Sequence, residues 1–184
     1  MCQQRLRCFR QYSRCTTIVW ALLLFELAAG AATAVVECTA DRALDGKGDA
    51  HATELPAGGA LLMFRFEAIR DWKVNKGDLF LHLEKGSVPA RLELALVQAP
   101  WNERDALKMD VRKLNFLPQP VEGQPERWIR LAIPASILEM LAAGKGTGLA
   151  IRDRTSAGKD RVLHARESMH NGAYLIVDGA PPQR

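Results

Sequence analysis

The sequence has few of the groups that cross-link a chain. Only four of its 184 residues are cysteines, and three of these fall within the first fifteen positions. Beyond residue 34 only Cys38 is left, which excludes an internal disulfide from that part of the chain. A chain of about 150 residues buries about two-thirds of its unfolded surface, so an apolar core can hold it together without cross-links.

Recognisable catalytic motifs are also missing. The chain contains no G-x-S-x-G nucleophile elbow, no H-E-x-x-H zinc motif, no phosphate-binding loop and no paired-cysteine motif. We therefore expect a protein that is not an enzyme, with no catalytic residues and no cofactor. The alternative is a small polysaccharide-cleaving enzyme, in which Glu103 and Asp105 would flank one bond at roughly 5–9.5 Å. Solvation at the surface is the simpler role for both carboxylates.

A long apolar run occurs only near the N-terminus, where it belongs to a targeting signal. Arginines at positions 5, 7, 10 and 14 precede an apolar stretch from Ile18 to Phe25, and an A-x-A site follows at Ala32–Ala34. This is the order of a secretory signal peptide. We expect residues 1–34 to be a signal peptide cleaved after Ala34. Residues 35–184 would then form a single domain of a secreted protein, in the extracellular space or the periplasm.

An uncleaved membrane anchor is the alternative to a signal peptide. Extending the apolar run to Val36 gives roughly the ~20 residues that a membrane span requires. Glu26 would then lie near the centre of the bilayer, at a cost of about 2.5–3.5 kcal/mol. Cleavage is therefore favoured, and it leaves no stable membrane span.

The positive charge of the chain belongs mostly to this signal. The full sequence carries a formal net charge of +4, and residues 1–34 contribute four arginines and one glutamate, so cleavage lowers the net charge to +1. A nearly neutral domain is poorly suited to bulk electrostatic attraction, and we expect no nucleic-acid partner. Attraction to an anionic ligand would have to come from the local placement of arginines.

Alternation of apolar and polar residues organises the rest of the chain. Period-two segments lie at 61–67, 78–84, 91–97 and 127–133, and shorter segments lie at 148–152, 161–166 and 174–177. Each has one apolar face, which is typical of a strand. Turn signals separate them at 75–78, at 85–87 and in a proline-rich loop at 118–125, and a short helix is expected at 136–143. We predict an all-β fold, an antiparallel β-sandwich of jelly-roll type with one short helix.

Two groups of residues suggest metal ligands, but neither predicts a metal site. The groups are His164, Glu167 and His170, and Asp41, Asp45 and Asp49. On a strand Glu167 points away from both histidines, so polar residues at a strand end and turn explain the first group. In the second group Lys47 opposes a calcium site, and a glycine-rich turn explains the segment.

Outward strand positions favour a ligand-binding face. The candidate ligand-binding residues are Arg65, His82, Arg91 and Arg130, and a further basic cluster contains Arg152, Arg154, Lys159 and Arg161. A basic strip along a sheet would hold an acidic polysaccharide through charge-assisted hydrogen bonds. The alternative is an ordinary solvated face, because Glu67, Glu84 and Glu93 are interspersed among these residues.

The cysteine and the tryptophans have structural interpretations as well. Val36 and Cys38 alternate as in a strand, so we expect Cys38 to be a buried apolar residue. If it were exposed, it would allow a disulfide-linked dimer, as in a structural or interaction protein of the cell envelope. Trp72, Trp101 and Trp128 would stack on sugar rings or pack in the core, and packing is the commoner role.

The order of these segments resembles the DNRLRE-type, or disaggregatase-related, carbohydrate-binding modules, carbohydrate-binding module family 96. The similarity rests on segments spread over residues 36–178: Arg65-Phe66-Glu67, Trp101-Asn102-Glu103, Ile137–Leu141 followed by Gly148–Arg152, and Ala165–Ser168 followed by Tyr174–Val177. The chain departs from the family in several of these motifs, among them Glu67 in place of Asp and Ala165 in place of Ser. The resemblance implies a secreted jelly-roll-like module that binds polysaccharide, with acidic polymers such as alginate among the ligands of the family.

Overall fold

A computed structural model describes residues 31–44, 54–56, 59–101, 109–155, 162–164 and 172–182. The chain divides into two units, Met1–Ala31 and Ala32–Arg184. Of the expected signal peptide, only Ala31–Ala34 lie within the described residues. No described helix is long and apolar enough to cross a membrane. The second unit contains the β fold and the candidate site.

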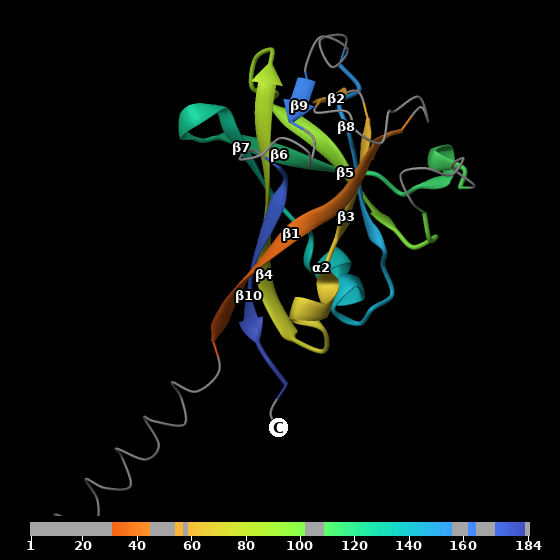
Figure 1. Ribbon diagram of the computed structural model, residues 1–184, viewed down its shortest axis with the longest axis vertical. Coiled ribbons are helices and arrows are strands. Elements are labelled where there is room, and N and C mark those ends of the chain that lie inside the picture. Colours follow the sequence, from red (N-terminus) through yellow and green to blue (C-terminus); the bar gives the residue numbers. More distant parts are fainter. Residues whose placement is uncertain are drawn as a thin grey trace, which may run out of the picture. The chain divides into compact units, whose positions relative to one another are not determined.

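Strands dominate the described part of the chain (Figure 1). The strands are β1 (Ala32–Ala43), β2 (Glu54–Pro56), β3 (Ala60–Phe64), β4 (Lys73–Lys85), β5 (Arg91–Val97), β6 (Leu117–Gly123), β7 (Trp128–Ala132), β8 (Gly148–Arg152), β9 (Val162–His164) and β10 (Tyr174–Ala180). The helices are α2 (Ala135–Ala142) and the 3-10 helices η1 (Phe66–Ile69), η2 (Val111–Lys113) and η3 (Pro125–Arg127). The prediction of a mostly β chain with one short α-helix is confirmed for the described residues.

The sheet closes into an antiparallel barrel of eight strands, so the predicted sandwich is wrong. The strand order is β10-β1-β3-β8-β5-β6-β7-β4, and β4 pairs again with β10 to complete the circle. β9 and β2 extend the sheet from β4.

The strands β1 and β6 connect the two halves of the barrel wall. In β1, residues 32–37 pair with β10 and residues 38–43 pair with β3. β6 does the same, since residues 117–120 pair with β5 and residues 121–123 with β7. Strands that pass from one sheet to another in this way form corners instead of open edges.

The corner strand β6 lies where the sequence predicts a loop at 118–125. Pro118 and Pro120 lack an N–H donor, which is the reason for that prediction. Val121 N donates to Ala90 O on the β5 side, 3.1 Å away. N–H directions alternate along a strand, so the nitrogens of both prolines point to the side of β6 opposite β5. On that side residues 117–120 have no paired strand, because β7 pairs only with residues 121–123. The prolines therefore cost the sheet no hydrogen bond.

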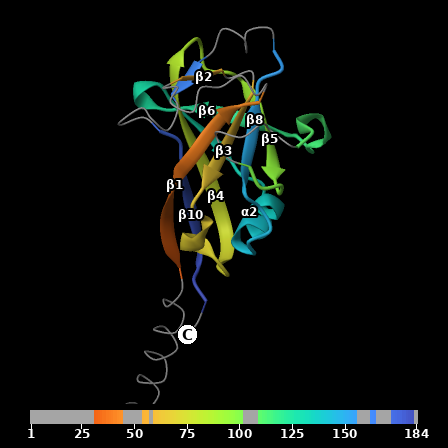
Figure 2. The same cartoon turned by 45° about the vertical axis from the view of Figure 1, so that its right-hand side comes forward.

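β4 runs through residues 75–78, where the sequence predicts a turn. Gly77 lies within β4, and its lack of a side chain serves packing and not a turn. A Cβ at this position would lie 2.7 Å from a methyl carbon of Leu138, so α2 can pack closely against the strand only at a glycine. Ile137, Leu138 and Leu141 of α2 are buried. The helix ends before Gly144, which has a φ of +68° and serves as the expected stop signal. Figures 1 and 2 both place α2 at the opposite end of the barrel from β2 and β9.

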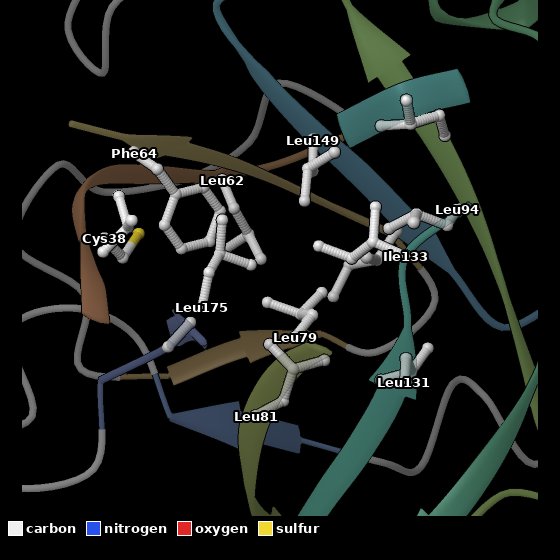
Figure 3. Packing of buried hydrophobic residues seen from close by; sticks show 14 of the residues in the cluster. Cys38, Leu62, Phe64, Leu79, Leu81, Leu94, Leu131, Ile133, Leu149 and Leu175 are labelled. Carbon is white, nitrogen blue, oxygen red and sulfur yellow. The ribbon is translucent and has the colours of Figure 1, made fainter. Parts of the chain in front are cut away.

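Apolar side chains fill the barrel (Figure 3). Leu79, Leu81 and Leu83 of β4 point inward, as their alternation predicts. Cys38 is buried near Phe64, which confirms its interpretation as a core residue. A disulfide-linked dimer would require an exposed Cys38, and the structure does not provide one.

A second, smaller apolar cluster covers the outer face of β3, β8 and β5. Leu61, Ala95, Val97 and Ala150 form its buried part, and Leu44, Trp101, Met109, Leu114 and Phe116 pack against them. Trp101 therefore has the packing role that the sequence favours. Beside this cluster Arg152 lies over the ring of Phe116, 3.6 Å from the centroid, and binds Glu93 at 2.6 Å. This outer face is occupied by the chain itself.

NMR tests the closure of the barrel. Because β6 pairs with β5 and β7, and β10 pairs with β1 and β4, we expect interstrand NOEs between Val121 and Leu131, between Leu92 and Gln119, and between Leu175 and both Val36 and Leu79. An open arrangement would lack at least one of these contacts, and that result would contradict the closed barrel.

Truncation of the core tests the importance of the β4 leucines. Leu79 is fully buried, so Leu79→Ala should lower the free energy of unfolding by about 2–5 kcal/mol in urea denaturation followed by circular dichroism. Val88 is 46% exposed, and Val88→Ala should change this free energy by less than about 0.5 kcal/mol. Equal effects of the two substitutions would show that Leu79 does not support the core.

Candidate functional site

The outer face of β4, β7 and β10 carries a group of aromatic rings. Phe80 and Tyr174 are cross-strand partners and stack with ring centroids 4.9 Å apart and an interplanar angle of 3°. Trp128 meets Tyr174 edge-on at 5.3 Å and His82 edge-on at 5.1 Å. All four side chains are partly exposed. We call Phe80, His82, Trp128 and Tyr174 the aromatic face.

Ion pairs border the aromatic face. Arg130 Nε lies 3.1 Å from Asp78 Oδ1, and Arg130 Nη1 lies 3.0 Å from Glu122 Oε2. Lys76 Nζ is 3.1 Å from the other oxygen of Asp78. The hydrogen bond and the charge of Asp78 raise the pKa of Arg130, and Glu122 adds to this effect. The two cations and two carboxylates balance, so the border of the face has little net charge.

The structure brings together only two of the four candidate ligand-binding residues. His82 pairs with Trp128, and Arg130 pairs with Phe80, so both lie on the outer side of the β4–β7 ladder. Arg65 follows β3, and Arg91 is the first residue of β5. Neither β3 nor β5 is a neighbour of β4 or β7 in the barrel. Both arginines are exposed. The predicted residues therefore do not line one continuous basic strip.

Arg127, which is not among the candidate site residues predicted from the sequence, holds the connection between β6 and β7. Its Nε donates to Leu83 O at 2.7 Å, and its Nη2 donates to Gly86 O at 3.2 Å. Glu126 and Arg127 have φ values of 55° and 64°, in a region that costs a non-glycine residue about 1–3 kcal/mol. The two side-chain hydrogen bonds offset this strain and fix the position where β7 begins, at Trp128. The local sequence does not predict these hydrogen bonds, because the carbonyls that accept them lie about forty residues earlier in the chain.

A group of potential metal ligands lies beside the aromatic face. His82 and Glu84 come from β4 and His164 comes from β9, and their ligand atoms all lie within 4.8 Å of one another. Glu84 Oε2 contacts His164 Nε2, and the rings of His82 and His164 are 4.7 Å apart between centroids. We call these three residues the His–Glu–His cluster.

His164 has other partners in the structure than the residues that follow it in the sequence. Its partners in the structure are on β4, whereas Glu167 and His170 lie outside the described residues. The spacing His82-Leu83-Glu84 does place an imidazole and a carboxylate on one strand face. Only the pairing of Leu83 with Leu163 brings His164 beside them.

The other polar candidates lie elsewhere or outside the described residues. Arg152 is paired with Glu93, Arg154 is exposed, and Asp41 is buried in β1. The remaining candidates lie outside the described residues: Asp45, Lys47, Asp49, Glu103, Asp105, Lys159 and Arg161.

Burial lowers the pKa of His82 below its ordinary value of 6.5, and the charge of His164 lowers it further. The charge of Arg127 acts in the same direction, whereas a hydrogen bond with the backbone of Glu126 and the charge of Glu84 oppose the shift. The neutral imidazole, the form that binds metals, is thus favoured near neutral pH.

Titration tests this shift. With EDTA present, we expect the ring protons of His82 to titrate below pH 6.5 in NMR spectra. The unfolded chain takes up this proton near pH 6.5 and the folded chain resists it, so the free energy of unfolding should fall as the pH falls below about 6.5. His82→Gln should reduce that slope. A midpoint at or above 6.5 would contradict the assignment.

No protein-family model matches the chain, and no curated protein is significantly similar to it. The resemblance to the DNRLRE-type modules stays a prediction, and the sandwich that it implies is replaced by a closed barrel.

Proposed function

We propose that this protein is an exported, non-catalytic module that binds a polysaccharide through the aromatic face. The observation that carries the proposal is the outward direction of Phe80, Trp128 and Tyr174, which contact one another outside the barrel while leucines fill its interior. Aromatic side chains that remain partly exposed offer a large apolar surface, which suits the C–H faces of sugar rings.

The polar groups around the aromatic face support the same proposal. Binding sites for small molecules and sugars combine apolar surface with a few placed hydrogen-bonding groups. Arg130, Glu122 and His82 are such groups, and each contacts or pairs with a residue at this part of the sheet. Sugar hydroxyls both donate and accept hydrogen bonds, so a mixed border of cations and carboxylates fits them.

The charge of the border argues for recognition of sugar rings and not of acidic groups. Arg130 is engaged by Asp78 and Glu122, so an anionic glycan would have to compete with two carboxylates. We therefore expect binding to depend only weakly on salt, because few charges would be newly paired.

The N-terminal sequence and the family resemblance support export and polysaccharide binding independently of the aromatic face. The basic, apolar and A-x-A segments favour secretion. The alternative of a disulfide-linked envelope protein has lost its main support, because Cys38 is buried.

Affinity electrophoresis of the purified protein in gels that contain neutral or acidic polysaccharides tests this proposal. Retardation by at least one polysaccharide is expected, and Trp128→Ala should weaken binding about tenfold or more, since one aromatic contact contributes about 0.5–1.5 kcal/mol beyond its buried area. Trp72→Ala is the matched control, because Trp72 is partly exposed but lies outside the aromatic face.

Two arginine variants separate the aromatic face from the basic-strip hypothesis. Arg65→Ala and Arg91→Ala should leave binding unchanged, because neither residue lies on the β4–β7 ladder. A loss in these variants, with none in Trp128→Ala, would favour the basic strip and overturn the proposed face. Absence of retardation by every polysaccharide would overturn the function itself.

A further inference from the structure

We propose that the His–Glu–His cluster binds a divalent transition-metal ion of the Zn²⁺ class. His82 and Glu84 are separated by one residue on β4, so both leave the same face of the strand. Leu83 pairs with Leu163, which places His164 of β9 beside them on that face. Two hydrogen-bonded strands thus hold the three side chains together, and the site does not depend on a loop.

The distances within the cluster suit a metal ion. Zinc binds imidazole nitrogen and carboxylate oxygen at about 2.0–2.2 Å, so two ligands in a tetrahedral site lie about 3.4 Å apart. The ligand atoms of His82, Glu84 and His164 are all within 4.8 Å of one another, and Glu84 already contacts His164. Rotation of the three side chains would be needed to bring their ligand atoms to this separation.

The types of ligand define the class of cation. Two imidazoles and one carboxylate are a ligand set for zinc and for iron(II), whereas calcium and magnesium prefer oxygen ligands only. Three protein ligands leave at least one coordination position open. A water molecule or an oxygen of a bound ligand would occupy that position.

An unpaired nitrogen atom gives independent support. The Nδ1 atom of His82 is buried and has no hydrogen-bond partner among the described residues, whereas His164 faces Glu84 with its Nε2 atom. A buried polar atom without a partner costs about 1–3 kcal/mol, and a bond to a metal would remove this cost. The hydrogen bond of His82 with the backbone of Glu126 orients the ring in the way that is common for metal-bound histidines.

Charges of both signs lie near the cluster. Glu84 supplies one negative charge, whereas the guanidinium of Arg127, which is hydrogen-bonded to the carbonyls of Leu83 and Gly86, opposes a cation at His82. Trp128 packs edge-on against His82 and restricts its ring. The ion would therefore lie at the border of the aromatic face. This inference does not rest on glycan binding and is tested without a glycan.

Calorimetric titration with Zn²⁺, and visible absorption with Co²⁺ as a spectroscopic probe, test the site on tag-free full-length protein after removal of metals with EDTA. Cys2, Cys8 and Cys15 are potential zinc ligands of their own, so the measurements use a background in which all three are replaced by serine. We expect one ion per chain and a Co²⁺ spectrum of a site with nitrogen and oxygen ligands.

Single substitutions identify the ligands. His82→Gln, Glu84→Gln and His164→Gln should each weaken Zn²⁺ binding by about 100-fold or more, since changes even in supporting residues of metal sites cost 10–100-fold. Glu139→Gln is the matched control, because Glu139 is an exposed carboxylate on α2 that belongs to neither proposed site and should leave binding unchanged. Circular dichroism of each variant establishes that it is folded before binding is measured.

Three results would overturn the proposal. The first is the absence of stoichiometric binding in the folded protein. The second is binding that survives all three substitutions. The third is binding that is lost in His170→Gln and retained in His82→Gln, which would assign the metal to the neighbours of His164 in the sequence. None of these results bears on polysaccharide binding by the aromatic face.

Discussion

The requirement that strands at a sheet edge find hydrogen-bond partners shapes this molecule. β1 and β6 meet this requirement by pairing with one neighbour along their first half and with another along their second half. In β1 the register shifts between Cys38 and Ala40, where the strand passes from β10 to β3. An irregularity of this kind bends a strand and increases its twist. The eight strands therefore form a closed wall.

Closure gives every strand of the wall an inner and an outer face, and the outer face is used in two ways. Over β3, β8 and β5, the apolar residues of the outer face are covered by Leu44, Trp101, Met109, Leu114 and Phe116. Over β4, β7 and β10, aromatic rings remain partly exposed, and the His–Glu–His cluster lies next to them. The proposed functions lie on this second part, where the leucines behind the aromatic rings keep the strand rigid.

The alternation of residues along β4 is the part of the site that could be predicted. It separates Leu79, Leu81 and Leu83 from Phe80, His82 and Glu84, and the structure confirms both faces. The position of the helix before Gly144 and the burial of Cys38 were also predictable from local signals. The turn expected at 75–78 and the loop expected at 118–125 were wrong, because glycine and proline were tolerated in strands for reasons of packing and strand direction.

The sequence by itself determined that the chain is mostly β, which residues of β4 face the core, and that no disulfide forms beyond residue 34. Only the tertiary structure decided that the sheet closes, and that Trp128, Tyr174 and His164 lie beside residues of β4. The physical reason is that side-chain alternation is a local property of one strand. Pairing and register are set by contacts between segments far apart in the chain, and no local pattern encodes them.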